Sequence, residues 1–82
     1  TMQAHSSISI RPLAETQPVP YSLLLSADPS KDLIDSYLKN GELFVAELNN
    51  EIVGVLVLYS HEQQVEIKNI AVAENHQNKG IG

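Results

Sequence analysis

Residues 65–82 read VEIKNIAVAENHQNKGIG, and this stretch decides how the rest of the chain is interpreted. Residues 65–72 have the apolar pattern of a strand, the next four turn polar, and Gln77-Asn78-Lys79-Gly80-Ile81-Gly82 closes the stretch. Glycines at alternate positions after a strand allow several backbone N–H groups to face one point without a Cβ in the way. A helix after Gly82 would add its unpaired N–H groups and the positive end of its dipole. The pattern therefore predicts an anion site made of a strand, a glycine loop and the helix expected next.

Length and composition favour one small globular domain. Eighty-two residues with 43% hydrophobic content suffice for a single core. The net charge is −5 and the five basic residues are scattered, which argues against a nucleic-acid partner. The longest apolar run, residues 52–59, is far shorter than the roughly 20 residues that cross a bilayer. With no signal-peptide pattern and no cysteine, we expect a cytoplasmic protein without a membrane partner.

Three further strands are predicted upstream of residues 65–72. Residues 8–11 alternate apolar and polar side chains ahead of Pro12. Glu42–Leu48 and residues 52–59 form a hairpin around Asn49-Asn50, because asparagine tolerates positive φ. The second of these strands is apolar at nearly every position, so we expect both its faces to be covered. Gly54 within it marks either a bulge or the close approach of a helix.

Two helices are predicted between the first strand and the hairpin. Residues 21–27 are a short apolar segment after a proline. The second helix is expected to begin with Asp28 as its cap and Pro29 in its first position. Gly41 is expected to end it in the left-handed conformation. Its apolar face would consist of Leu33, Ile34, Tyr37 and Leu38.

The six closing residues match the Q/R-x-x-G-x-G/A signature, and four residues separate them from an Ile-Ala-Val strand end. In this context the chain resembles the GNAT superfamily of acyl-CoA N-acyltransferases. The resemblance implies an α+β fold of order β-α-α-β-β-β, in which a mainly antiparallel four-stranded sheet carries two helices. It also implies that residues 1–82 are a single truncated domain, the N-terminal half, ending before the helix that follows the fourth strand.

The resemblance further implies acetyl-CoA as a co-substrate. Backbone N–H groups would hold its pyrophosphate, and Gln77 would open the signature; the residues concerned are Asn78, Lys79, Gly80, Ile81 and Gly82. The alternative is a plain turn between two elements. Ile70, Ala71 and Val72 resemble the strand end whose backbone pairs with the pantetheine arm, which requires an open strand edge. The alternative there is that Ile70 and Val72 are simply core residues.

Glu66 matches the strand position at which some members of the superfamily hold a general base. Such a base removes a proton from the substrate ammonium, so that a neutral amine attacks the thioester. The alternative is an exposed Glu66 beside Lys68 on the same strand face. No metal is expected, because the three histidines share no ligand spacing and all are interpreted as solvent-facing loop residues.

The resemblance therefore implies an acetyl-CoA-dependent N-acetyltransferase that acts on a primary amine of a small molecule or peptide. The chain itself is expected to be an inactive fragment, because half of the cofactor cleft and the general-acid tyrosine would lie after residue 82. The alternative is a non-catalytic CoA-binding or oligomerisation module. The open edge of residues 65–72 is expected to pair with a second copy of the chain.

Overall fold

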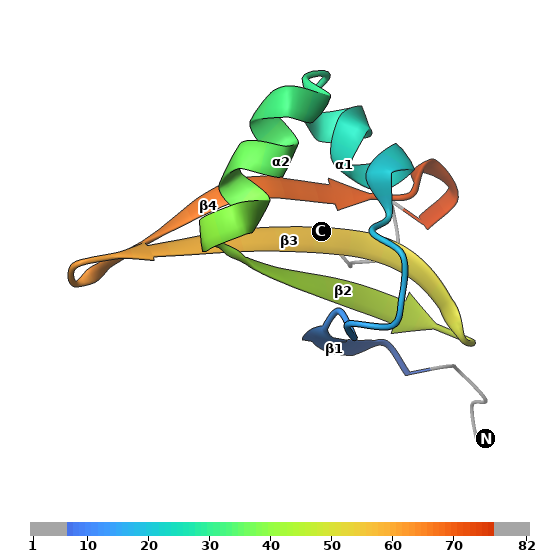
Figure 1. Ribbon diagram of the computed structural model, residues 1–82. Coiled ribbons are helices and arrows are strands. Elements are labelled where there is room, and N and C mark those ends of the chain that lie inside the picture. The colour runs from blue at the N-terminus through green and yellow to red at the C-terminus, as the bar shows by residue number, and fades with distance from the viewer. Residues whose placement is uncertain (1–6, 77–82) are drawn as a thin grey trace.

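The computed structural model describes residues 7–76, which form one antiparallel sheet and two helices (Figure 1). The strands stand side by side in chain order, and each pairs antiparallel with the next. In sequence the elements are β1 (Ser9–Pro12), α1 (Tyr21–Ala27), α2 (Lys31–Asn40), β2 (Glu42–Leu48), β3 (Glu51–His61), β4 (Gln64–Val72) and a 3₁₀ turn (Glu74–His76). The predicted α+β class and the order β-α-α-β-β-β are confirmed.

The turns of both hairpins use residues with positive φ. Asn49 and Asn50 have φ of 53° and 67°, as expected for asparagine in a two-residue hairpin turn. Glu62 has φ of 57° and turns the chain from β3 into β4. His61 is the last residue of β3 and is exposed, so its placement in a loop was wrong although it does face solvent.

The start of α2 differs from the predicted start. Ser30 caps the helix, because its Oγ accepts a hydrogen bond of 3.1 Å from the backbone N–H of Leu33. Asp28 is the C-cap residue of α1, and its backbone N–H donates a hydrogen bond to Leu24 O. Its Oδ1 accepts from the Ser30 N–H at 3.1 Å, which is an Asx turn leading into the helix. The prediction of Asp28 as cap and Pro29 as first helical residue is therefore wrong.

Gly41 ends α2 for a reason other than the predicted one. Its φ of −102° and ψ of 176° are extended backbone rather than left-handed. A Cβ at this position would lie 2.9 Å from the carbonyl oxygens of both Leu58 and Tyr37. Glycine is needed here because two backbone segments approach closely, and its conformational freedom plays no part.

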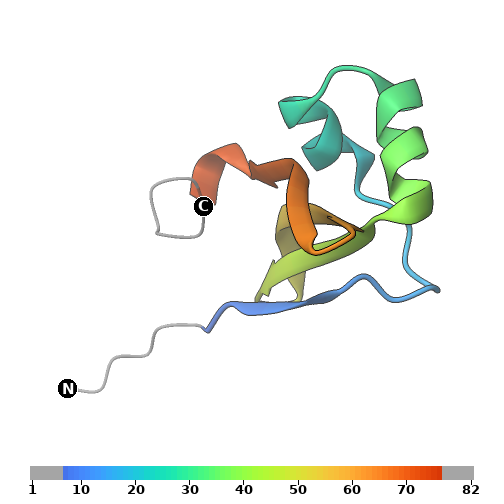
Figure 2. The same cartoon turned by 90° about the vertical axis from the view of Figure 1, so that its left-hand side faces the viewer.

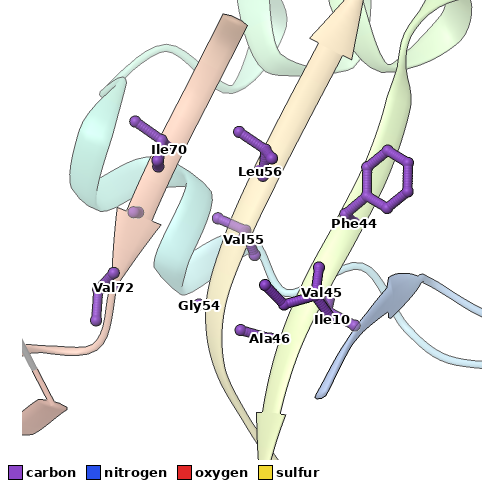
Figure 3. Close-up of a pocket in the computed structure, with 10 residues that line it drawn as sticks. Ile10, Phe44, Val45, Ala46, Gly54, Val55, Leu56, Ile70 and Val72 are labelled. Atoms are coloured by element: carbon purple, nitrogen blue, oxygen red, sulfur yellow. The ribbon is translucent and has the colours of Figure 1, made fainter. Parts of the chain in front are cut away.

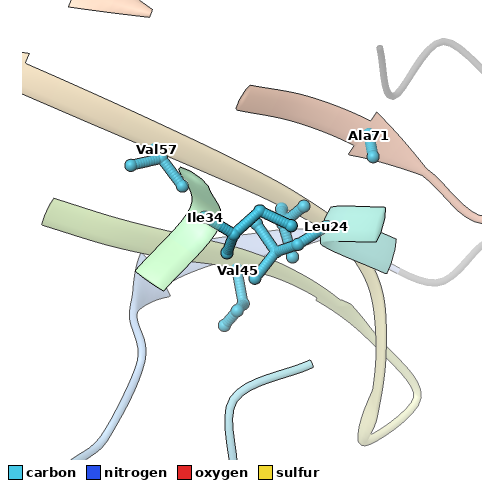
Figure 4. Close-up of a cluster of buried hydrophobic side chains, with 6 residues drawn as sticks. Leu24, Ile34, Val45, Val57 and Ala71 are labelled. Carbon is cyan, nitrogen blue, oxygen red and sulfur yellow. The ribbon is translucent and has the colours of Figure 1, made fainter. Parts of the chain in front are cut away.

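Both helices cover the same face of the sheet (Figures 1 and 2). Helix α1 contacts β4 and β3, and α2 contacts β3. The core between the layers is apolar (Figure 4) and consists of Leu24, Ile34, Val45, Val55, Val57 and Ala71. Truncating a fully buried side chain such as Leu24 or Ile34 to alanine would cost about 2–5 kcal/mol. This one-sided core fixes β4 against α1 and thereby positions the candidate site.

The opposite face of the sheet carries no helix among residues 7–76. Ile10 and Ile70 are 66% and 51% exposed on it, and a shallow apolar hollow of about 80 Å³ lies between them (Figure 3). This hollow is small compared with ordinary ligand sites, which measure about 300–1,000 Å³. The expectation that both faces of β3 are covered therefore holds only for the helix side in this part of the chain.

The glycine in β3 accompanies a bulge, as one of the two sequence interpretations proposed. Ala46 pairs with Gly54, whereas the next residue, Glu47, pairs with Ile52. Val53 is therefore the extra residue, and the strand bends at this point.

Candidate functional site

Strand β4 is the outermost strand of the described sheet. It pairs with β3 on one side, and no strand of residues 7–76 lies on its other side. Its last three residues, Ile70, Ala71 and Val72, are the predicted docking edge for a pantetheine arm. They lie on the outermost strand of the described sheet, and their role in strand-like binding of an extended ligand stays a prediction.

A bulge interrupts β4 two residues before that edge segment. Asn69 pairs with Val57, whereas the next pair on the other side joins Ile67 with Leu58. Lys68 is therefore an extra residue with no partner of its own in the β3–β4 register. A bulge bends the strand that contains it, so the backbone of β4 changes direction at Lys68.

The bulge keeps the apolar side chains of β4 on one face although their spacing is irregular. Val65, Ile67 and Ile70 are 63%, 59% and 51% exposed, and they share the face that carries no helix. Asn69 and Ala71 are buried on the helix side. The signal for this in the sequence is the pair of consecutive polar residues Lys68-Asn69, which breaks the alternation of the strand.

Asn69 is the only buried polar residue in the part of the chain that the structure describes, with 4% exposure. Its Nδ2 donates to Leu24 O of α1 at 3.1 Å and to Tyr37 Oη of α2 at 2.8 Å. Tyr37 Oη in turn donates to Asp28 Oδ2 at 3.1 Å. Burial raises the pKa of Tyr37, and the hydrogen bond to Asp28 raises it further. The sequence analysis did not find this network, because its members are far apart in the chain.

The side chain of the candidate base Glu66 is exposed to solvent. Its carboxylate forms an ion pair of 3.2 Å with Lys68 Nζ, and its side chain is 61% exposed. The Lys68 ammonium also lies 5.6 Å from the centre of the Tyr59 ring. Glu66 and Lys68 are thus neighbours on one side of the strand, as the alternative interpretation of Glu66 proposed.

A second cluster joins the two helices at their exposed side. Tyr21 Oη donates a short hydrogen bond to Asp35 Oδ1, and Lys31 Nζ lies 3.0 Å from Asp35 Oδ2. The hydrogen bond from Tyr21, and then the contact with Lys31, lower the pKa of Asp35. The same bond raises the pKa of Tyr21, and the contact with Asp35 raises the pKa of Lys31. The cluster links α1 to α2.

The end of β4 borders a hollow of about 390 Å³ between this strand and α1. Its described lining consists of Ser22, Leu23, Ser26, Val72, Ala73 and Glu74. The predicted pyrophosphate loop follows directly in the chain, but Gln77, Asn78, Lys79, Gly80, Ile81 and Gly82 lie outside the described residues. In the chain, the last lining residue, Glu74, lies three positions before Gln77.

Metal-ligand groups and membrane-spanning helices are absent from the part of the chain that the structure describes. No group of three or more histidine, cysteine, aspartate or glutamate residues within residues 7–76 could hold a metal ion. No helix in the same range is long and apolar enough to cross a membrane.

The strand order and the two helices are those that the resemblance to acyl-CoA N-acyltransferases implied, and the Q-x-x-G-x-G sequence follows β4 in the chain. The sequence profile of the Acetyltransferase (GNAT) family matches residues 10–82. The chain belongs to this family, and the resemblance seen in its last six residues is confirmed.

Similar proteins are known from several bacteria. An uncharacterized N-acetyltransferase of Bacillus subtilis, YvbK, is 52% identical over 69 residues, which are 83% of this chain and 44% of that protein. A GNAT family acetyltransferase from Elizabethkingia anophelis, solved with acetyl-CoA bound, is 59% identical with a TM-score of 0.86, covering 90% of this chain and 49% of its own. A Bacillus subtilis acetyltransferase solved in complex with CoA is 48% identical with a TM-score of 0.83, and the match covers 93% of this chain and 51% of that one. The chain therefore spans about half the length of the relatives that it matches.

Proposed function

We propose that this chain is the N-terminal half of an N-acetyltransferase domain that transfers acetyl from acetyl-CoA to a primary amine. The amine nitrogen attacks the thioester carbonyl carbon, the new C–N bond forms, and the C–S bond breaks. CoA leaves as a thiolate that takes up a proton, and the amine loses one. Catalysis would come mainly from holding the two reactants together and polarising the carbonyl.

The observation that carries this proposal is the position of β4 as the outermost strand of the described sheet, separated by four residues from the glycine signature in the chain. Ile70, Ala71 and Val72 lie on that edge, and a 390 Å³ hollow opens beside the strand end. Two relatives of similar fold were solved with acetyl-CoA or CoA. In the proposal, the backbone of β4 pairs with the pantetheine arm while the amides of residues 78–82 receive the pyrophosphate.

Glu66 is the proposed general base. Its carboxylate is accessible to solvent, so it could take a proton from the ammonium directly or through a water molecule. In the structure this carboxylate forms an ion pair with Lys68. The role therefore requires the Lys68 ammonium to turn away, toward the Tyr59 ring that it already approaches.

The chain alone is proposed to lack acetyl transfer, because it spans about half the length of its relatives. The test compares the 82 residues with the full-length protein that would contain them, using acetyl-CoA and a panel of primary amines. CoA release above the blank is expected only from the longer protein. Release by the 82 residues alone would overturn the fragment proposal, and no release by either protein would overturn the acetyltransferase proposal.

A second candidate function is a non-catalytic module that binds CoA or associates with itself. The observation in its favour is the outermost position of β4, whose Val65 and Ile67 are 63% and 59% exposed. Such an edge is prone to pair with another strand, and a second copy of the chain would supply one. Light scattering on the 82 residues should show a dimer or larger species, and replacing Ile67 with lysine should reduce it. A monomer at high concentration would exclude this association.

A further inference from the structure

The buried carboxamide of Asn69 has a fixed orientation. Leu24 O can only accept a hydrogen bond, so the group that faces it at 3.1 Å must be Nδ2. The second Nδ2 hydrogen is directed to Tyr37 Oη at 2.8 Å, whose own hydrogen goes to Asp28. Oδ1 consequently points away from these partners, and it is buried with no donor among the described residues.

This arrangement is costly for a residue that serves only to fill the core. A buried acceptor without a donor destabilises a protein, whereas replacing both partners of a buried polar contact with apolar groups is often nearly neutral. Such a departure from the rule that buried polar groups are paired is expected at functional or strained sites. Directional hydrogen bonds fix where a strand lies more narrowly than apolar packing does.

The carboxamide joins β4 to both helices, and two of these elements, α1 and β4, line the hollow at the end of the strand. Leu24 O also accepts from the Asp28 N–H at 3.1 Å, so the Asn69 contacts include the junction between α1 and α2. On the strand, Asn69 is the first residue after the bulge. Ile70, the beginning of the proposed pantetheine edge, is the next residue in the chain.

We infer that Asn69 is a positioning residue, whose carboxamide sets the place of the Ile70–Val72 backbone relative to α1 and α2 and thereby the fit of acyl-CoA. The inference rests on the proposed function. Asp28 and Tyr37 act with Asn69, because the carboxylate orients the tyrosine hydroxyl that accepts from Nδ2. None of the three side chains needs to touch the reacting atoms.

The test uses the full-length protein and acetyl-CoA as the probe. In the double variant Asn69→Leu with Tyr37→Phe, both ends of the buried contact become apolar together, and the thermal midpoint is expected to change by only a few degrees. The Kd for acetyl-CoA from calorimetric titration, and the KM for acetyl-CoA, should rise about tenfold. The KM for the amine should stay within about twofold. Ser36→Ala, on the exposed side of α2, is the matched control and should bind as the wild type does.

A residue with a merely structural role would change the thermal midpoint and leave the acetyl-CoA affinity of the folded protein unaltered. Wild-type binding together with unchanged binding by the double variant would therefore overturn this inference alone. A wild-type protein that does not bind acetyl-CoA would overturn the proposed function as well. If the double variant does not fold, Tyr37→Phe alone should raise the Kd about threefold by freeing the Asn69 carboxamide on one side, and an unchanged Kd would overturn the inference.

Discussion

Deleting Lys68 removes the extra residue of the bulge in β4 and leaves every other pairing intact. Ile67 still faces Leu58 and Asn69 still faces Val57, and these two pairs become consecutive. The remaining strand, VEINIAV, alternates without a break, with its valines and isoleucines on the helix-free face and Asn69 and Ala71 on the helix side. The deletion should therefore convert a bulged strand into a regular one.

The stability change follows from the contacts of Lys68. The variant loses an exposed ion pair with Glu66, which contributes about 0–1 kcal/mol. It also loses the cation–π contact with Tyr59, which contributes roughly 0.5–1 kcal/mol. Regular pairing restores one or two ladder hydrogen bonds of about 1 kcal/mol each. The free energy of unfolding should consequently change by no more than about 1 kcal/mol.

Deletion of Asn69 is the matched control, because it removes the neighbouring polar residue from the same bulge. The strand again becomes regular, but Lys68 then occupies the position that is 4% exposed. Burying a lysine there costs about 3 kcal/mol or more, through desolvation and overpacking. Urea denaturation followed by circular dichroism measures both variants. Equal destabilisation by the two deletions would refute the bulge at Lys68.

Three further variants test other parts of the structure. Gly41→Ala should lose about 1–3 kcal/mol of unfolding free energy, because the new Cβ meets backbone oxygens at 2.9 Å, and a stabilised variant would contradict this close approach. Glu66→Gln should lower kcat of the full-length protein by about 10² or more and remove the acidic limb of its pH profile, and unchanged kinetics would remove Glu66 from the mechanism. The pKa of Asp35 is lowered in the folded protein. Its contribution to the free energy of unfolding is therefore fully present above the unfolded-state pKa of about 3.9 and is lost as the pH falls through the folded-state pKa. The urea midpoint of the wild type should therefore exceed that of Asp35→Asn at pH 7, the difference should disappear in acid, and a difference independent of pH would contradict the Tyr21–Asp35–Lys31 cluster.

The order of the elements could be predicted from the sequence, because each segment carries its own local signals. Residues 21–27 were predicted as a helix with the bounds observed for α1. The Asn49-Asn50 turn fixed the first hairpin through its positive φ values. Local signals failed where two elements compete for one residue. Asp28 suits a helix start but is already engaged as the last cap of α1.

The structural roles of Gly41 and Asn69 could not be predicted, because they depend on contacts with distant parts of the chain. Gly41 was predicted to be a left-handed helix cap, whereas glycine is needed there because β3 approaches too closely to leave room for a Cβ. The hydrogen bonds of Asn69 to Leu24 and Tyr37 span 45 and 32 residues of chain. The bulge did leave a local trace in Lys68-Asn69, two polar residues where a strand should alternate. The assignment of residues 77–82 to the pyrophosphate site stays a prediction.

The central claim is that the outer edge of β4 and the loop after it bind acyl-CoA. Backbone amide shifts in a ¹⁵N–¹H spectrum of the full-length protein, followed during titration with acetyl-CoA, test it most directly. The largest changes are expected at residues 70–72 and 77–82, with little change in β1 and β2. Changes confined to the helix-free sheet face around Ile10 and Phe44, or no changes at all, would contradict the claim.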